Sequence, residues 1–285
     1  KSRDYEELKL LPRPGHADYT GFVKYGGFND YRGGGHFSGR LTAPLVFAGA
    51  VAKQVLKMQN IIIASHIKSI HDVCDESFDS INIDEEALKE LINSDFPVLD
   101  ALAGQKMKEL ILDAKKEKDS VGGIIETIVI NLEPGLGSPF FDGVESRMAH
   151  ALFSIPAVKG IEFGSGFDIT RLRGSQANDE FVLEGDRIVT STNHNGGILG
   201  GITTGMPLLF RVAIKPTPSI GISQGTVDIQ KMQETTIMVK GRHDPCIVPR
   251  AIPAVEAAAA VVILDLLFER DGEHGLFRGF KSADR

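Results

Sequence analysis

Stretches rich in β-branched residues alternate along the chain with long stretches rich in Ala, Val and Leu. This alternation restricts the chain to folds that pack helices against a sheet. Residues 60–69 and 208–214 have the composition typical of strands. Residues 42–58 and 253–270 are predicted helices, and Pro44 fits the first turn of a helix, where no N–H is needed. No repeat of 20–50 residues indicates a solenoid. The pattern predicts a layered α/β or α+β architecture.

The remaining predicted elements follow the same rules of periodicity and turn composition. The further helices are predicted at residues 85–92, 99–118 and 139–152. The further strands are predicted at residues 122–132, 160–169 and 235–240. A glycine- and Asn-rich loop is predicted at residues 190–205. A chain of 285 residues is long enough for one large domain or two small ones.

The formal net charge of −7 arises from one segment of the chain. Residues 72–119 contain 14 acidic residues and six lysines, whereas the rest of the chain is close to neutral. The overall acidity argues against a nucleic-acid partner. We expect residues 72–119 to form a solvated or assembly face.

The cysteines, the apolar runs and the histidine spacing limit the class of protein further. Cys74 and Cys246 lie outside any CxxC or zinc spacing, so we expect two reduced thiols and a cytoplasmic protein. The longest apolar run, near residues 257–268, contains Asp265 and is shorter than the ~20 residues of a membrane span. We therefore predict no membrane segment. Without HxH or HExxH spacing we also predict no metal site.

Five short segments combine Arg, His or Lys with Gly or Pro. They lie at residues 11–19, 31–40, 173–178 followed by 193–201, 215–219 and 241–246. Guanidinium groups bind phosphate and carboxylate through paired hydrogen bonds, and glycine lets the backbone approach a ligand closely. His16 can act as an acid or a base near neutral pH. Each segment alone is also compatible with an ordinary turn, helix cap or strand end. Together they predict a positively charged, glycine-lined pocket for a large phosphorylated ligand.

Seven of these and neighbouring stretches resemble the chorismate synthase family, in the family's own order. They are RPGHADY at 13–19, GGGHFSGR at 33–40, SIPAVKG at 154–160, RGSQ at 173–176, GGILGG at 196–201, KPT at 215–217 and RHDPC at 242–246. The resemblance implies an α+β fold, a β-α-β sandwich with long helices between antiparallel sheets. It also implies a single domain over residues 1–285 and a homotetramer.

The resemblance further implies a lyase of the shikimate pathway of aromatic amino acid biosynthesis. The family converts 5-enolpyruvylshikimate-3-phosphate into chorismate and phosphate by a 1,4-anti elimination. The reaction requires reduced FMN and has no net redox change. Some relatives reduce their own flavin with NADPH.

Roles for individual residues follow from the matched motifs. His16 resembles the histidine that protonates reduced flavin near N1, and Asp244 resembles the acidic residue near N5 that is implicated in removing the proton. The substrate-binding arginines are expected to be Arg13, Arg40 and Arg242. The expected flavin contacts are His36, Phe37, Ser38, Gln176, Ala177, Gly200, Lys215, Pro216, Thr217, Pro218, Ser219 and Arg242. Many relatives have Arg-Ser-Ser where this chain has His36, Phe37 and Ser38.

The family begins with a segment that contains Gly-Glu-Ser-His-Gly, and its histidine is thought to protonate the leaving phosphate. Nothing in this sequence matches that segment, and the chain begins at Lys1 without an initiator methionine. We therefore expect an N-terminally truncated chain whose activity is lost or impaired. The alternative function is a non-catalytic module that binds flavin or phosphate.

Overall fold

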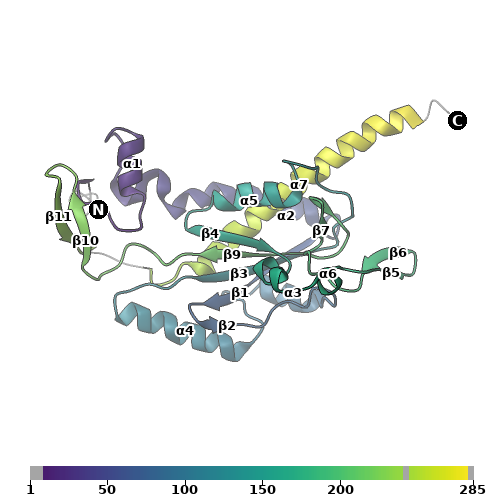
Figure 1. Cartoon of the computed structure of the whole chain (residues 1–285), viewed down its shortest axis with the longest axis horizontal. Helices are drawn as coiled ribbons and strands as arrows, with labels where there is room; N and C mark the ends of the chain where they lie inside the picture. Colours follow the sequence, from purple (N-terminus) through teal and green to yellow (C-terminus); the bar gives the residue numbers. More distant parts are fainter. Residues whose placement is uncertain (1–8, 240–243, 282–285) are drawn as a thin grey trace.

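A five-stranded antiparallel sheet lies at the centre of the protein (Figure 1). The structure is a computed structural model that describes residues 9–239 and 244–281. The strand order is β2-β1-β3-β9-β4, and each neighbouring pair is antiparallel. The strands are β1 (Ile62–Ile70), β2 (Val73–Cys74), β3 (Gly123–Ile130), β4 (Val158–Phe163) and β9 (Leu208–Ile214).

The central strands are apolar because both of their faces are covered by helices. Side chains alternate along β9, so Phe210 joins the main core while the adjacent Leu209 joins a second, smaller core. The main core contains side chains of α2 (Thr42–Lys57), α5 (Val144–Phe153) and α7 (Val248–Lys281). On the other face, α3 (Glu85–Ile92) contributes Leu88 and Leu91 to the smaller core. A further helix, α4 (Ala101–Lys116), packs against β1 and the edge strand β2.

Shorter elements gather at the two ends of the sheet (Figure 1). One end carries α1 (Asp18–Lys24) and the ribbon of β10 (Gln224–Asp228) and β11 (Gln233–Ile237). Two 3-10 helices, η3 (Arg32–Phe37) and η4 (Gly39–Leu41), connect α1 to α2. The opposite end carries α6 (Gly174–Ala177) and two ribbons, β5 (Phe181–Glu184) with β6 (Arg187–Thr190) and β7 (Ile198–Leu199) with β8 (Ile202–Thr203).

The mixed α+β class expected from the sequence is confirmed. Among the described residues, the antiparallel strands form this five-stranded sheet and three two-stranded ribbons. The predicted helix at 85–92 and the predicted strand at 208–214 have the predicted bounds.

Two predicted elements extend too far because glycines interrupt them. The helix predicted from residue 139 begins at Val144, and the residues before it form a turn in which Ser138 N–H donates to the Asp142 carbonyl oxygen. The extended segment predicted at 160–169 ends at Phe163. It ends there because Gly164 has a positive φ of 55° and the 3-10 helix η5 (Gly166–Arg171) follows.

Two other predictions miss structure near glycine or proline. The predicted loop at 190–205 contains the β7–β8 ribbon, whose turn residues Gly200 and Gly201 have φ values of 61° and 82°. Helix α7 begins at Val248 rather than at Pro253. Pro249 lies in the first turn, where a missing N–H costs no helical hydrogen bond, and Pro253 lies one turn later and removes a single helical hydrogen bond.

Of the predicted strand at 235–240, residues up to Ile237 belong to β11, and residue 240 lies outside the described residues.

Helix α7 supplies much of the core. By length and composition it is the one described helix that could cross a membrane. Its central residues Val255, Ala259 and Ile263 are almost fully buried against the sheet and α2. Packing inside the protein accounts for the apolar composition of this helix.

Candidate active site

The loop before α1 holds a compact group of three charged or titratable side chains. Arg13 is only 6% exposed, and it donates to Asp18 through three nitrogens. The backbone N is 3.0 Å and Nε is 2.7 Å from Asp18 Oδ2, and Nη2 is 2.8 Å from Oδ1. On the same carboxylate, His16 Nδ1 lies 2.6 Å from Asp18 Oδ1. Asp18 therefore joins Arg13 and His16 in one cluster.

The ionisation of Asp18 is determined by this cluster. Burial alone raises the pKa of the Asp18 carboxyl, but the hydrogen bonds from Arg13 and His16 outweigh burial and hold the pKa well below its usual range. Asp18 is therefore a carboxylate at neutral pH. Its charge balances the buried guanidinium of Arg13.

Residues 215–219, which follow β9, complete this region. Lys215 Nζ donates to the Gly15 carbonyl oxygen, and Arg13 Nη1 donates to Ser219 Oγ over 3.0 Å. On the other side of the loop, Ser120 Oγ donates to the Thr217 carbonyl oxygen over 2.7 Å. The end of β9 is therefore bound to the loop before α1. The structure brings Arg13, His16 and residues 215–219 together.

The 3-10 segment before α2 covers the ring of His16. A Cβ built on Gly34 would lie 3.5 Å from His16 Nε2 and 3.7 Å from Ser38 Cβ, and Gly34 has a φ of 88°. Glycine at this position therefore lets the backbone approach the imidazole. Ser38 and His16 both lie next to Gly34. Ser38 Oγ also accepts a hydrogen bond from the Arg40 backbone N at 3.3 Å.

The other predicted residues of this segment point in several directions. His36 is exposed, with its ring 6.3 Å from the ring of Tyr25. Phe37 packs on α1, because a Cβ added to Gly21 would meet its ring. Arg40 is exposed.

The residues before β3 connect Asp244 to this region. Val121 N–H donates to the Pro245 carbonyl oxygen over 2.8 Å, and the preceding residue Ser120 bonds to Thr217. The Asp244 side chain is 25% exposed and forms an ion pair with Arg250. Arg242 lies outside the described residues.

The predicted flavin contacts Gln176, Ala177 and Gly200 lie elsewhere. Gln176 belongs to α6 and Gly200 to the β7–β8 turn, at the opposite end of the sheet from α1 and β10 (Figure 1). The side chain of Gln176 is exposed, and its Oε1 accepts the Arg173 backbone N–H over 3.0 Å. One copy of the chain does not bring these residues together with His16.

Sequence reasoning assigned no role to Asp18, although it lies inside the RPGHADY motif. The available signal was its spacing, since a carboxylate two residues after His16 and five after Arg13 can reach both when Pro14 and Gly15 turn the chain. Within the described ranges, no group of three or more His, Cys, Asp or Glu side chains is arranged to hold a metal ion.

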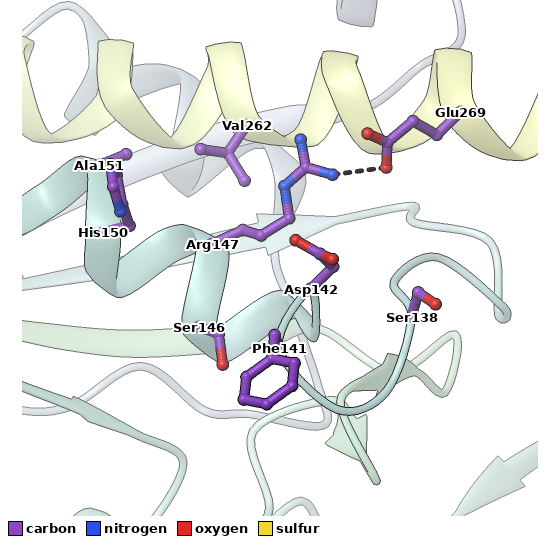
Figure 2. Close-up of a pocket in the computed structure, with 9 residues that line it drawn as sticks. All are labelled: Ser138, Phe141, Asp142, Ser146, Arg147, His150, Ala151, Val262 and Glu269. Atoms are coloured by element: carbon purple, nitrogen blue, oxygen red, sulfur yellow. Dashed lines mark hydrogen bonds and ion pairs between the residues drawn. The ribbon is translucent and has the colours of Figure 1, made fainter.

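A cavity lies outside this region, between α5, α7 and the loop before α5 (Figure 2). It has a volume of about 640 Å³. Arg147 extends across it and forms ion pairs with Asp265 and Glu269 of α7. The cavity contains none of the residues predicted to act on a ligand. Its lining residues are Ser138, Phe141, Asp142, Ser146, Arg147, His150, Ala151, Val262 and Glu269.

The helix-covered antiparallel sheet and the cluster of Arg13, His16 and Asp18 beside it define an α+β protein with a buried charged site at one end of its sheet. Comparison with known proteins identifies the family. The family model described as chorismate synthase matches residues 1–268, and the chain belongs to the chorismate synthase family. Members of this family are lyases of aromatic amino acid biosynthesis.

Individual relatives agree with this assignment. The chain is 50% identical over 275 residues to chorismate synthase of Thermococcus kodakarensis, covering 96% of this chain and 75% of the relative. It is 50% identical over 268 residues to chorismate synthase of Pyrococcus abyssi, covering 93% and 73%. A crystal structure of chorismate synthase superposes with a TM-score of 0.73 at 32% identity, covering 89% of this chain and 70% of that one. The family match over residues 1–268 gives no support to the expectation that this chain is inactive.

Proposed function

We propose that this chain catalyses the 1,4-anti elimination of phosphate from 5-enolpyruvylshikimate-3-phosphate, giving chorismate and phosphate. The observation that carries this proposal is the convergence of Arg13, His16, Ser38 and residues 215–219 in a chain of this family. Residues far apart in the sequence meet there, and the glycine backbone of Gly34 lies against His16. A non-catalytic module would need the anion-binding groups but not the two proton-transfer candidates, His16 and Asp244.

Reduced FMN is the proposed cofactor, and the residues present fit it. Thr217 Oγ1 is buried and has no hydrogen-bond partner among the described residues, so it can bond to a bound ligand. Lys215 supplies a cation beside it, and Gly15 and Gly34 have positive φ values of 71° and 88°. We propose that Ser38 and Lys215 to Ser219 hold the flavin. When bound, reduced FMN supplies electron density to the substrate and recovers it as the ring C–H bond breaks.

The remaining chemistry belongs to side chains of this protein. Arg13, Arg40 and Arg242 are proposed to bind the phosphate and carboxylates of the substrate, because guanidinium forms paired bonds with both groups. Arg13 uses Nε and Nη2 on Asp18, and one N–H of Nη1 on Ser219. The second N–H of Nη1 is proposed as the donor to the ligand.

Two side chains are proposed to move protons. His16 offers Nε2, the nitrogen that lies against Gly34, for proton exchange with the flavin. Asp244 is proposed to remove the proton from the substrate ring. Its carboxylate, which pairs with Arg250, is the group proposed to accept that proton.

The protein is also proposed to be a cytoplasmic homotetramer. Both cysteines are free thiols, as is usual in a reducing compartment. Gln176, Ala177 and Gly200 lie at the far end of the sheet from His16 (Figure 1). In a homotetramer these residues can reach the flavin site of another copy.

The proposed function is tested by anaerobic turnover with photoreduced FMN and 5-enolpyruvylshikimate-3-phosphate. The unmodified chain is expected to form chorismate. Asp244→Asn is expected to reduce turnover by about 100-fold or more, because the proton acceptor is lost. FMN affinity, measured by fluorescence quenching, is expected to change little.

The matched control is Asp113→Asn, which removes the same charge from an exposed ion pair with Lys116 on α4. It is expected to turn over like the unmodified chain. Normal turnover by Asp244→Asn contradicts the role of Asp244. Flavin binding without any chorismate formation by the unmodified chain supports the non-catalytic module instead.

A further inference from the structure

We infer that Asp18 is a positioning residue: it fixes the tautomer and orientation of His16 and holds Arg13 in place. This inference rests on the proposed function, in which His16 exchanges a proton and Arg13 binds substrate. It is argued from the geometry of the Asp18 carboxylate, which contacts both Arg13 and His16.

Both carboxylate oxygens of Asp18 contact Arg13 or His16, and neither caps helix α1, which begins at Asp18. Asp18 is the first residue of α1, yet its carboxylate accepts from Arg13 and contacts His16. The N-cap of α1 is Ala17, with no side-chain cap hydrogen bond. A role limited to capping α1 therefore does not account for these contacts.

The contact with His16 determines which ring nitrogen carries the proton. An ionised carboxylate can only accept, so the Asp18 oxygen that lies 2.6 Å from His16 Nδ1 favours the ring form that carries its proton on Nδ1. In the neutral ring, Nε2 is then left without a proton. Nε2 lies against Gly34, which is also next to Ser38, so the basic nitrogen is on the side of the proposed flavin site.

Arg13 makes this arrangement rigid. Its guanidinium binds both oxygens of Asp18, and Nη2 lies 3.1 Å from His16 Nδ1 and 3.2 Å from Nε2. Nearly equal distances to both nitrogens place Nη2 against the face of the ring. The imidazole is thus held at its edge by Asp18 and at its face by Arg13.

The direct test is the tautomer of His16, measured by ¹⁵N NMR of histidine-labelled protein at pH 8.5 without flavin or substrate. The His16 signals are assigned by their loss in His16→Gln. In the unmodified chain, Nδ1 is expected to carry the proton. In Asp18→Asn, the ratio of the Nδ1–H to the Nε2–H form is expected to fall by about tenfold or more, because a charge-assisted hydrogen bond is lost.

An unmodified chain in which Nε2 carries the proton overturns the inference, even if Asp18→Asn does not fold. An unchanged ratio in folded Asp18→Asn overturns it as well. Asp113→Asn is the matched control and is expected to leave the His16 signals unchanged. Since no turnover is needed, this measurement gives an answer even if the proposed reaction is wrong.

Turnover then separates positioning from a general effect on folding. Asp18→Asn is expected to lower kcat by about 100-fold, as loss of the carboxylate that orients a catalytic histidine does elsewhere. In the His16→Ala background, adding Asp18→Asn is expected to lower kcat by less than about twofold, since residues that act as one unit are not additive. A full second loss in that background contradicts action through His16.

Discussion

At the scale of single residues, burial separates the two cysteines. Cys246 is 6% exposed, and burial raises the pKa of its thiol to about 11, although a backbone hydrogen bond from Val248 lowers it slightly. Cys74 is exposed on the edge strand β2. Only the thiolate reacts with disulfide reagents, so burial lowers the reactivity of Cys246 through both its raised pKa and its restricted access.

We therefore predict that a disulfide reagent at pH 8 labels one thiol per chain in the native protein. Cys74 is expected to react rapidly, and Cys246 only after unfolding. Counting released chromophore before and after addition of denaturant measures this, and Cys74→Ser is expected to abolish the rapid phase. Two rapidly reacting thiols in native protein would contradict the assignment of Cys246 as a packed, unreactive residue.

At the scale of elements, helices α2 and α7 are in contact at Gly49 of α2. A Cβ on Gly49 would overlap the Cα and Cβ of Ala257 and lie 3.0 Å from its carbonyl oxygen. The backbones of the two helices therefore approach closely at Gly49, and small residues at the crossing permit this contact.

We predict that Gly49→Ala lowers the free energy of unfolding by about 1–3 kcal/mol, although alanine is the better helix former. Overlap with backbone atoms of α7 cannot be relieved by a side-chain rotation. Urea unfolding followed by circular dichroism measures the change. Gly225→Ala in β10 is the control, because no atom lies within 4 Å of the added Cβ. A Gly49→Ala protein as stable as the unmodified one would show that α7 can move away freely.

At the scale of the whole molecule, a buried charge cluster joins the sheet to the acidic segment. The side chains of His66, Asp75 and Glu126 are fully buried. His66 Nδ1 lies 2.8 Å from Asp75 Oδ2, and Nε2 lies 3.0 Å from Glu126 Oε2. Arg211 Nη1 is 3.6 Å from Glu126 Oε1 and Arg211 Nε is 2.7 Å from Glu162 Oε1. Residues 72–119 are therefore not a purely solvated face, because Asp75 is part of the interior.

Two opposing effects determine the protonation of His66. Burial alone lowers the pKa of His66, but the hydrogen bonds to Asp75 and Glu126 and their charges outweigh burial and raise it. The folded protein therefore binds a proton at His66 more tightly than the unfolded chain, whose His pKa is about 6.5.

We predict that this cluster makes the protein less stable as the pH rises above about 6.5. The contribution of His66 is fully present below the unfolded pKa and is lost as the pH rises through the raised folded pKa. Urea unfolding at a series of pH values from 6 to 9 measures the slope, and His71→Gln, at an exposed histidine, is the control that retains it. A free energy of unfolding that increases over this interval would contradict the prediction.

Local sequence determined those elements whose own residues supply a strong pattern. The helix Glu85–Ile92 was predictable because Asp84 caps it and its apolar residues repeat at helical spacing, and the strand Leu208–Ile214 because β-branched and apolar residues fill it. The motifs at residues 13–19, 33–40 and 215–217 also identified the family. In β4 and α5, glycine conformations that depend on the surroundings displaced the predicted ends.

Only the tertiary structure decided which of these segments meet. Strand β9 lies between β3 and β4, and Arg13 reaches Ser219 although 206 positions separate them. It also decided that Asp18 binds both Arg13 and His16, and that Gln176 and Gly200 lie at the other end of the sheet. Helix hydrogen bonds join near neighbours, so local sequence predicts them. Strand pairing and side-chain clusters join distant residues, and burial of both faces of the sheet selects among the possible pairings.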